Sequence, residues 1–197
     1  FAVWEDDEGI KRRGVSGGGA PTGDTVLVST DGRNPAAGGG WIAFERVSSG
    51  EIVLRGVDEQ VIPEPDPASL PDVSGVTPAV VYLAATPAGP VPRMWWNDEI
   101  IDLADGNVLA QAPRVAMAAD GPVAIVSDAT VRLVRPDGDT ELVYKAQSAG
   151  RAHVAVGHNR TVAAVGTSTG LWLTDGNMGR TLPSLGASDP AIEPVDA

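Results

Sequence analysis

Arg114 to Val134 reads RVAMAADGPVAIVSDATVRLV, and His153 to Leu173 reads HVAVGHNRTVAAVGTSTGLWL. The two stretches align without a gap, from position 115 onto position 154, at an offset of 39 residues. Identical pairs include Val115 with Val154, Val123 with Val162, Val126 with Val165, and Thr130 with Thr169. Each stretch joins short apolar runs through tight turns. The pair therefore indicates a repeated all-β unit of about 40 residues.

The same unit can be traced twice more towards the N-terminus. Strands are expected at 41–47, 51–55 and 60–62, and again at 79–84, 93–96 and 99–103. The second strands of the four units align on Ile42, Val81, Val123 and Val162, at spacings of 39, 42 and 39 residues. Five Asp-Gly pairs, which favour two-residue hairpin turns, punctuate the chain. The pattern predicts sheets of consecutive antiparallel strands.

Outside these units the sequence predicts further strands, loops and a tail. Strands are expected at 1–4, 9–13 and 25–29, with a flexible Gly-rich loop at 15–23. Residues 33–40 predict an insertion, and residues 63–78, with five prolines, predict a linker between units. The domain is expected to span residues 1–183, followed by a Pro- and Ala-rich C-terminal tail at 184–197.

The composition indicates an apolar core beneath an acidic surface. The chain has 197 residues, 43% of them hydrophobic, and a net charge of −12. Phosphate backbones repel such a surface, so nucleic acid is not an expected partner. No apolar run is long enough for a membrane-spanning helix, and the lack of Cys excludes disulfides and Cys-ligated metals. Because the sequence begins with Phe1 rather than Met, we expect a processed chain or a segment of a larger protein.

Gly170 to Leu182 reads GLWLTDGNMGRTL and resembles the Asp-box hairpin of sialidase-like and related propellers. That motif runs roughly Ser-x-Asp-x-Gly-x-Thr-Trp. Its places are taken here by Asp175, Asn177, Gly179, Thr181 and Leu182. In that family the motif is a structural turn away from the catalytic centre, so the resemblance implies no sialidase activity.

The period of the repeat resembles that of WD40-like, NHL-like and quinoprotein-like β-propellers. The resemblance implies an all-β, β-propeller-like fold with about four to five blades of antiparallel strands, or part of a larger propeller. Four units can be traced, and pairing of the two ends of the chain would supply a fifth by ring closure. A fold of this kind does not define a function.

Trp95-Trp96-Asn97-Asp98-Glu99 combines two aromatic rings with two carboxylates. On a strand, Trp95 and Trp96 face opposite sides, so one is expected in the core and the other exposed or between blades. An exposed Trp beside carboxylates suits a sugar or a peptide. The predicted ligand-binding residues are therefore Trp95, Trp96, Asp98 and Glu99. Packing between blades is the alternative, because aromatic residues are ordinary packing units in propellers.

Two motifs with catalytic or metal-binding spacing do not meet the structural context that such sites need. Gly14-Val15-Ser16-Gly17-Gly18 fits the G-x-S-x-G nucleophile elbow, but the Gly-Ala-Pro that follows is a poor helix start. His153 and His158 are five residues apart, which directs them to opposite faces of a strand. Neither a catalytic Ser nor a metal site is predicted from them.

Two acidic runs and one basic run are interpreted as solvated surface, and alternatives remain for both kinds. Asp6-Asp7-Glu8 and Asp98-Glu99 would suit glycoside hydrolysis if a carboxylate pair came within about 5–10 Å. Lys11-Arg12-Arg13 is interpreted as a solvated strand end. A processing site and a contact for an acidic partner are its alternatives.

These observations predict a non-catalytic protein- or ligand-binding β-propeller module of an exported or cell-envelope bacterial protein. A protein partner or second chain that completes the propeller is expected, with carbohydrate as a further ligand; no cofactor and no metal are expected. The alternatives are a carbohydrate-active hydrolase or lyase, or a subunit of one, with loop carboxylates at the propeller channel, and a structural subunit of a larger assembly. Buried carboxylates of raised pKa at the channel would favour the enzyme, and an exposed apolar rim the binding module.

Overall fold

The computed structural model describes residues 1–75, 77–103 and 109, and beyond these the strands that lie between Arg114 and Pro183. In those later strands, side chains are described at 115–117, 123–125, 127, 130 and 132–134. The described residues contain nineteen strands and no helix. The predicted tail at 184–197 lies outside the described residues. The described residues include no helix with the length and apolarity of a membrane span.

The strands form five antiparallel sheets, each made of strands that are consecutive in the sequence. The first sheet contains β1 (Ala2–Asp6), β2 (Gly9–Val15) and β3 (Pro21–Ser29). The second contains β4 (Gly32–Gly38), β5 (Trp41–Arg46), β6 (Ile52–Arg55) and β7 (Glu59–Val61). The third contains β8 (Ala68–Ser74), β9 (Ala79–Thr86), β10 (Gly89–Trp96) and β11 (Glu99–Asp102).

The last two sheets repeat the four-strand pattern. The fourth contains β12 (Arg114–Met117), β13 (Val123–Ser127), β14 (Thr130–Val134) and β15 (Thr140–Lys145). The fifth contains β16 (His153–Val156), β17 (Ala163–Thr167), β18 (Gly170–Thr174) and β19 (Gly179–Pro183).

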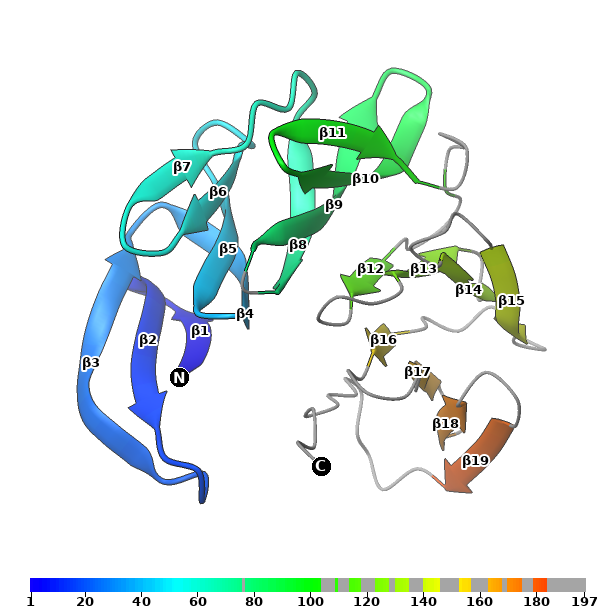
Figure 1. Ribbon diagram of the computed structural model, residues 1–197, viewed down its shortest axis with the longest axis horizontal. Helices are drawn as coiled ribbons and strands as arrows, with labels where there is room; N and C mark the ends of the chain where they lie inside the picture. Colours follow the sequence, from blue (N-terminus) through cyan, green and yellow to red (C-terminus); the bar gives the residue numbers. More distant parts are fainter. Residues whose placement is uncertain are drawn as a thin grey trace.

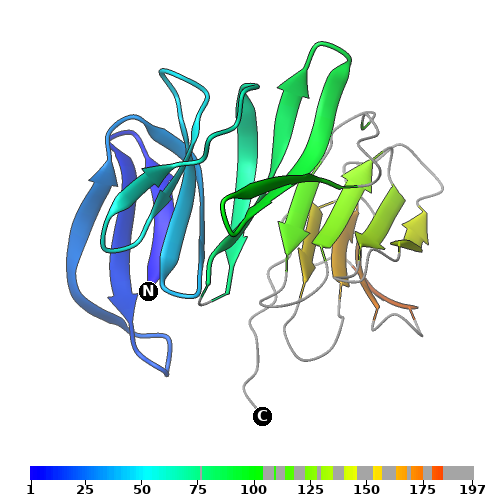
Figure 2. The same ribbon diagram turned by 45° about the horizontal axis from the view of Figure 1, so that its top comes forward.

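The five sheets follow one another along an arc (Figure 1). The first strand of each sheet lies on the inner side: β1 contacts β4, β4 contacts β8, β8 contacts β12, and β12 contacts β16. Figure 2 shows the same succession in a tilted view, with the first and fifth sheets at opposite ends. The expected pairing of the two chain ends into one sheet is therefore wrong, because β1–β3 and β16–β19 form separate sheets.

The hydrophobic core lies between neighbouring sheets, because alternate residues of a strand face opposite sides. Between the first and second sheets are buried Ile10, Val28, Ile42, Phe44 and Val53. Between the second and third lie Ala43, Ile52, Leu54, Ile62, Ala68, Val73, Val80, Tyr82, Ala84 and Trp95. Between the third and fourth lie Val81, Leu83, Leu103, Leu109, Val115, Val123 and Ile125. The middle strands β5, β6 and β9 thus each contribute to two separate clusters.

The repeat is present, but one residue of the predicted alignment is displaced. Ile42 and Val123 pack against the sheet that precedes their own. Val81, aligned with them from the sequence, packs against the sheet that follows. Val80 packs against the preceding sheet and is the structural equivalent. A shift of one residue moves a side chain to the opposite face of a strand. Because β9 has apolar residues on both faces, the sequence pattern alone does not distinguish Val80 from Val81.

A second displacement separates the fourth and fifth sheets. β12 and β16 begin 39 residues apart, as the ungapped alignment predicts, at Arg114 and His153. β13 and β17 begin 40 residues apart, at Val123 and Ala163. The connection before β17 is one residue longer, so Ala163 takes the place assigned to Val162, which lies outside the described residues.

Two segments predicted as an insertion at 33–40 and a linker at 63–78 instead contain the inner strands β4 and β8. Both strands are irregular at one X-Pro step, Asn34-Pro35 in β4 and Leu70-Pro71 in β8. Asn34 and Leu70 have positive φ values of 51° and 52°, and the pairing register shifts at each step. Each is therefore a β-bulge that contains a proline. The prolines, which argue against central strands, are accommodated because each inner strand has one unpaired edge.

The loop predicted at 15–23 is shorter in the structure, and most of the segment belongs to strands. β2 extends to Val15 and β3 begins at Pro21, so the connection comprises residues 16–20. The Ser16 N–H donates to the Ala20 carbonyl at 2.9 Å, and Ser16 Oγ accepts the Ala20 N–H at 3.1 Å. These two hydrogen bonds close a hairpin between two long strands.

Candidate functional site

The predicted ligand-binding residues lie at the turn between β10 and β11. Trp96 pairs with Glu99 across the hairpin, so Asn97 and Asp98 are its two central residues. Their φ values, 50° and 63°, are both positive, as a type I′ turn requires. Trp96 is 46% exposed, and Asp98 and Glu99 are exposed as well. The turn therefore presents one indole ring and two carboxylates to solvent on a short, rigid connection.

Trp95 occupies a different environment from its neighbour. It is 4% exposed and packs in the cluster between the second and third sheets. Its Nε1 has no hydrogen-bond partner, alone among the buried polar side-chain atoms of the described residues. The prediction that the two tryptophans face opposite sides is confirmed by these exposures. Direct ligand contact by Trp95 does not fit its burial, whereas the binding role of Trp96, Asp98 and Glu99 stays a prediction.

Asp72, on the inner strand β8, is a carboxylate at the joint between the third and fourth sheets. Its Oδ2 accepts the N–H of Met117 at 2.8 Å, and its Oδ1 accepts the N–H of Val73 at 2.9 Å. The residue as a whole is half-buried, and its carboxylate is the enclosed part. This burial raises the pKa of Asp72 to about 6, although the two hydrogen bonds lower it. The carboxylate ties β8 to β12.

The stability of the protein is expected to contain a component from Asp72 that falls as the pH rises. The pKa is 3.8 in the unfolded chain and about 6 in the folded protein. Between these values the folded state binds more protons, so the stabilisation is complete below 3.8 and is lost as the pH passes about 6. The difference corresponds to on the order of 2–3 kcal/mol.

Urea unfolding of the wild type and of Asp72→Asn, at several pH values between about 4 and 7, measures this component. The variant should lack it, so the difference between the two proteins should change with pH. Other carboxylates titrate in both proteins and cancel in that difference. A difference that is flat across the range would contradict the assignment.

A buried ion-pair cluster joins the start of β8 to β10 and β11. The Arg93 guanidinium binds Glu64, contacts Asp66 Oδ2 at 3.0 Å and contacts Asp102 Oδ1 at 2.8 Å. Tyr82 Oη donates to Glu64 Oε2 at 2.8 Å, and burial together with this carboxylate raises the pKa of Tyr82. The Glu64 side chain is only 2% exposed. One guanidinium thus holds three carboxylates, of which Glu64 is the most buried, and the contacts tie β10 to β11 and to the connection before β8.

A second buried carboxylate lies beside the bulge in β4. Glu45 on β5 is 1% exposed and forms an ion pair with Arg33. Its Oε2 also accepts the side-chain amide of Asn34 at 3.1 Å. Hydrogen bonding and attraction by Glu45 raise the pKa of Arg33. Glu5 of the first sheet accepts the backbone N–H of Asn34 at 2.8 Å, so two sheets hold this bulge.

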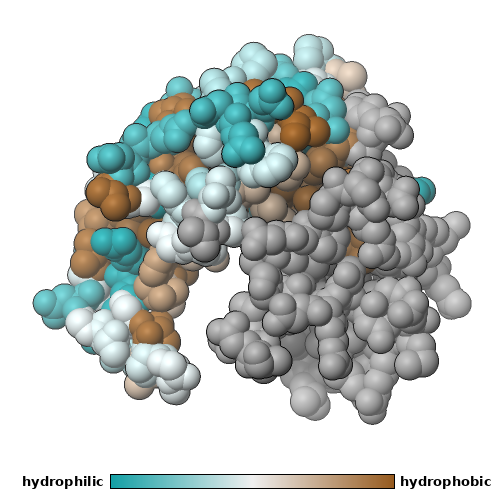
Figure 3. All heavy atoms as spheres, in the orientation of Figure 1, coloured by the Kyte–Doolittle hydropathy of each residue, from teal (hydrophilic) through white to brown (hydrophobic). Residues whose placement is uncertain are grey.

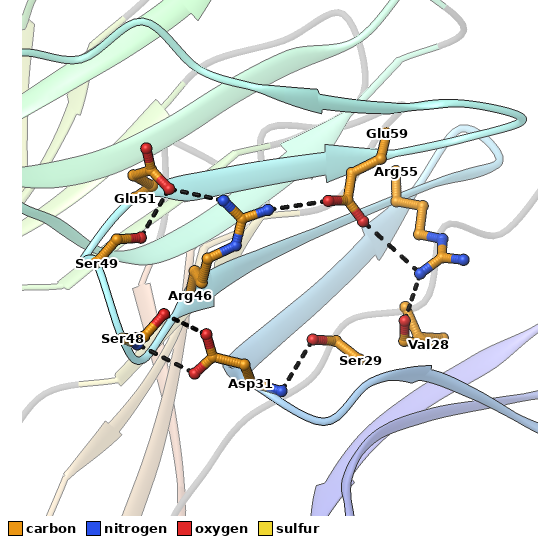
Figure 4. A network of polar contacts seen from close by, with 9 residues as sticks. All are labelled: Val28, Ser29, Asp31, Arg46, Ser48, Ser49, Glu51, Arg55 and Glu59. Atoms are coloured by element: carbon orange, nitrogen blue, oxygen red, sulfur yellow. Dashed lines mark hydrogen bonds and ion pairs between the residues drawn. The ribbon is translucent and has the colours of Figure 1, made fainter.

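Polar contacts at the outer side of the second sheet form a network (Figure 4). Arg46 binds Glu51 at 2.7 Å and Glu59 at 2.9 Å. Asp31 accepts the backbone N–H of Ser48 at 3.0 Å and its hydroxyl. Arg55 donates to the carbonyl of Val28 on β3, which links the second sheet to the first. These groups saturate one another, and the network fixes the hairpins of the second sheet.

The remaining sequence candidates do not come together as a site. Ser16 lies in the β2–β3 hairpin, where no helix follows it. His153 begins β16, and His158 lies outside the described residues. Gly179, Thr181 and Leu182 of the Asp-box-like stretch lie in β19, whereas Asp175 and Asn177 are outside the described residues. No group of three or more metal-ligating side chains occurs in the described part of the chain.

The acidic and basic runs of the first sheet neutralise each other in part. Lys11 contacts Asp6 at 2.9 Å and also binds Glu8. Hydrogen bonds to Glu8 and Asp6 raise the pKa of Lys11 to about 12. Arg12 makes no ion pair with any residue that the structure describes. Neighbouring carboxylates therefore neutralise only part of the positive charge of the Lys11–Arg13 run.

Comparison with solved structures identifies the arrangement of the sheets. No protein-family model matches the chain, and no curated protein matches it in sequence. The chain is similar to a structure of streptogramin B lyase, with a TM-score of 0.61 and 14% identity over 96% of this chain. It is similar to a chain of the nidogen/laminin complex, with a TM-score of 0.62 and 15% identity over 88%. It is also similar to the tricorn protease, with a TM-score of 0.55 and 17% identity over 76%.

These similar structures are β-propeller-type proteins. The chain has a β-propeller fold. Each of the five sheets that the structure describes is a blade, and β1, β4, β8, β12 and β16 are the inner strands of these blades. The chain spans 70% of the lyase chain, 70% of the nidogen/laminin chain and 16% of the tricorn protease chain. At these identities the likeness shows the fold alone.

Proposed function

We propose that this β-propeller is a non-catalytic binding module of an exported or cell-envelope bacterial protein, and that the β10–β11 turn contacts its ligand. The observation that carries the proposal is the exposure of Trp96 on a type I′ turn beside Asp98 and Glu99. An indole face packs against a sugar ring or an apolar peptide side chain, while carboxylates accept hydrogen bonds from hydroxyl or amide groups. Trp95, buried beneath the same strand end, fixes the position of the turn.

A protein partner that completes the propeller is part of this proposal. In the first blade, Trp4 and Leu27 both pair with Lys11, so the three share one face. Alternation places them opposite Ile10, which packs on the second blade. Leu27 is 48% exposed. A further blade from a second chain would cover this face, as blades cover one another elsewhere in the arc (Figure 1).

The exported location is proposed from the similarity of the fold alone. Several solved structures of similar fold are extracellular or secretion-system domains. The exposed hairpins that carry the binding residues also suit a module that meets its ligand on a surface.

Replacing Trp96 by alanine is expected to weaken ligand binding by about 2 kcal/mol or more, roughly thirtyfold, because exposed aromatic anchors dominate such contacts. The probes are a panel of neutral oligosaccharides and a panel of extended peptides, titrated against the full chain with calorimetric detection. Val57→Ala is the matched control, since Val57 is fully exposed on the β6–β7 connection. Unchanged affinity of Trp96→Ala for a probe that binds the wild type would refute the proposed surface.

A hydrolase or lyase is the second candidate, and the raised pKa of Asp72 on an inner strand is the observation in its favour. Both oxygens of that carboxylate are hydrogen-bonded by backbone N–H groups. Such a carboxylate has a structural task between blades. The binding module is therefore the function that the described residues support best.

A further inference from the structure

The first blade differs from the others in its number of strands. It contains three, whereas each of the other four blades contains four. Because β1 is the inner strand and the order is β1-β2-β3, the absent position is the outermost one, beside β3. Figures 1 and 2 both show β3 at the outer margin of the molecule. One edge of β3 pairs with β2, and the topology of the described strands gives the other edge no partner.

β3 has only some of the features that usually protect an edge strand. Protected edges are short, carry charged side chains or prolines, or contain bulges. β3 begins with Pro21, and its pairing with β2 shifts register twice. The outer strand β7 has three residues and β11 has four, but β3 has nine, of which the first seven are exposed. Val26 and Leu27 are adjacent apolar residues with exposures of 47% and 48%. Hydrophobic residues are visible at the outer margin of the first two blades (Figure 3).

Three guanidinium groups accompany this edge. Arg13 Nε donates to the carbonyl of Gly23 at 3.0 Å, near the start of β3. Arg55 donates to the carbonyl of Val28, near its end. Arg12 lies opposite Val26 in the β2–β3 pairing and has no ion pair among the described residues. The stretch 24–27 between the two bound carbonyls is therefore flanked by cations, with Asp24 as its own single carboxylate.

The stretch 24–27 offers backbone groups to the unpaired edge. The β2–β3 register shifts between Ile10 and Lys11 and again between Arg12 and Gly14, so Val26 and Leu27 lie between two bulges. Within the paired part, alternate residues direct their N–H and C=O groups away from β2. The side chains of Val26 and Leu27 lie on opposite faces of the sheet.

We propose that the unpaired edge of β3 binds an extended acidic segment of a protein partner as the fourth strand of the first blade. Backbone pairing involves the stretch 24–27. Apolar side chains of the partner cover Val26 and Leu27, and its carboxylates bind Arg12 and Arg13, while Arg55 is already paired with Glu59 at 3.7 Å. Strand addition of this kind obtains affinity from the main chain and specificity from alternate side chains. The site is separate from the β10–β11 turn and does not depend on the function proposed for it.

An acidic segment fits the edge better than a second β3 does. Pairing two β3 strands across a twofold axis would bring both sets of guanidinium groups to the same joint. Opposite charge across an edge is stabilising and like charge is destabilising. The partner is therefore expected to be a different segment, with acidic and apolar residues in alternation.

The test uses a fluorescein-labelled peptide of about eight residues in which Glu and Val alternate, a length that matches an ordinary strand. Its binding to the full chain is followed by fluorescence anisotropy. The Glu/Val peptide should bind, and a Lys/Val peptide of the same length should not. Val26→Pro removes one N–H from the middle of the unpaired stretch, on an edge strand, where proline is tolerated best. It should weaken binding by about tenfold or more, because the pairing around that residue is lost.

Two further variants separate charge and location. Arg12→Gln should weaken binding about threefold and reduce its dependence on salt, as expected for one charge contact. Trp96→Ala should bind the peptide like the wild type, so failure of the β10–β11 proposal is distinguishable from failure of this one. Val57→Pro, on an exposed connection of the second blade, is the proline control. Circular dichroism of each variant establishes that the sheets are intact.

Three outcomes would overturn the proposal. Equal binding of the Glu/Val and Lys/Val peptides would show that charge does not select the occupant. Equal affinity of folded Val26→Pro and wild type would show that the β3 backbone is not used. A dimer of the wild type in light scattering that becomes a monomer in Val26→Pro would assign the edge to a second copy of the chain.

Discussion

Replacing Trp95 by alanine is expected to lower the free energy of unfolding by about 3–5 kcal/mol, the usual cost of removing a large aromatic side chain from a core. Trp95 is 4% exposed and packs between the second and third blades. The indole fills a space that Ile52, Leu54 and Tyr82 also line in the same cluster. Their positions are fixed by strand pairing, so the resulting cavity cannot collapse fully. Urea unfolding at neutral pH measures the loss.

Two matched variants separate this effect from the loss of any tryptophan. Trp96→Ala, one residue away and 46% exposed, should cost less than about 1 kcal/mol. Trp95→Phe should cost less than Trp95→Ala, because the buried Nε1 has no hydrogen bond to lose. Equal losses for Trp95→Ala and Trp96→Ala would contradict the assignment of one ring to the core.

Replacing Arg93 by alanine is the second change with a large expected effect. Arg93 is the cation of a cluster with Glu64, Asp66 and Asp102. Removal of one partner leaves the other charge buried without compensation, at a cost of about 3–5 kcal/mol for enclosed pairs. The Glu64 side chain, 2% exposed, would be left in that position with the Tyr82 hydroxyl and the Asp66 backbone N–H as its remaining donors. The loss is measured by denaturant unfolding.

The control for Arg93 removes both charges together. Arg93→Met combined with Glu64→Gln should recover much of the stability lost by Arg93→Ala, since the most buried charge of the cluster is no longer left unpaired and Asp66 and Asp102 are more exposed. Arg46→Ala is a matched comparison, because Arg46 binds Glu51 and Glu59, whose side chains are 41% and 42% exposed. That variant should cost less than about 1 kcal/mol. A loss at Arg93 no greater than that at Arg46 would argue against a buried pair.

The sequence allowed the fold to be predicted, because the repeat combines two signals that do not depend on distant residues. Apolar runs of strand length and Asp-Gly turns recur at a nearly constant interval. The inner strands β4 and β8 were missed for a local reason: Pro35 and Pro71 lie within them, and proline argues against a paired strand. Positive φ at Asn34 and Leu70 accommodates the prolines in bulges, which composition does not reveal.

The candidate sites also contain features that could be predicted from the sequence and features that could not. The opposite exposures of Trp95 and Trp96 follow from strand alternation alone, so they could be predicted. The cluster around Arg93 could not, because Glu64 lies 29 residues away, on the connection between β7 and β8, and only the folded third sheet brings it to Arg93 on β10. The same holds for Asp72, whose partner Met117 is 45 residues away on the next blade. Contacts between blades depend on register, which a repeat period gives only to within a residue.

The prolines in the inner strands also limit where this molecule can assemble. β4 and β8 each end their sheet on the inner side, and an inner edge with a full set of N–H donors would bind any extended chain that entered the space between the blades. Pro35 and Pro71 each delete one donor, and the bulges around them interrupt the even spacing that a new strand needs. The inner edges of the second and third blades are thereby protected against the addition of a foreign strand.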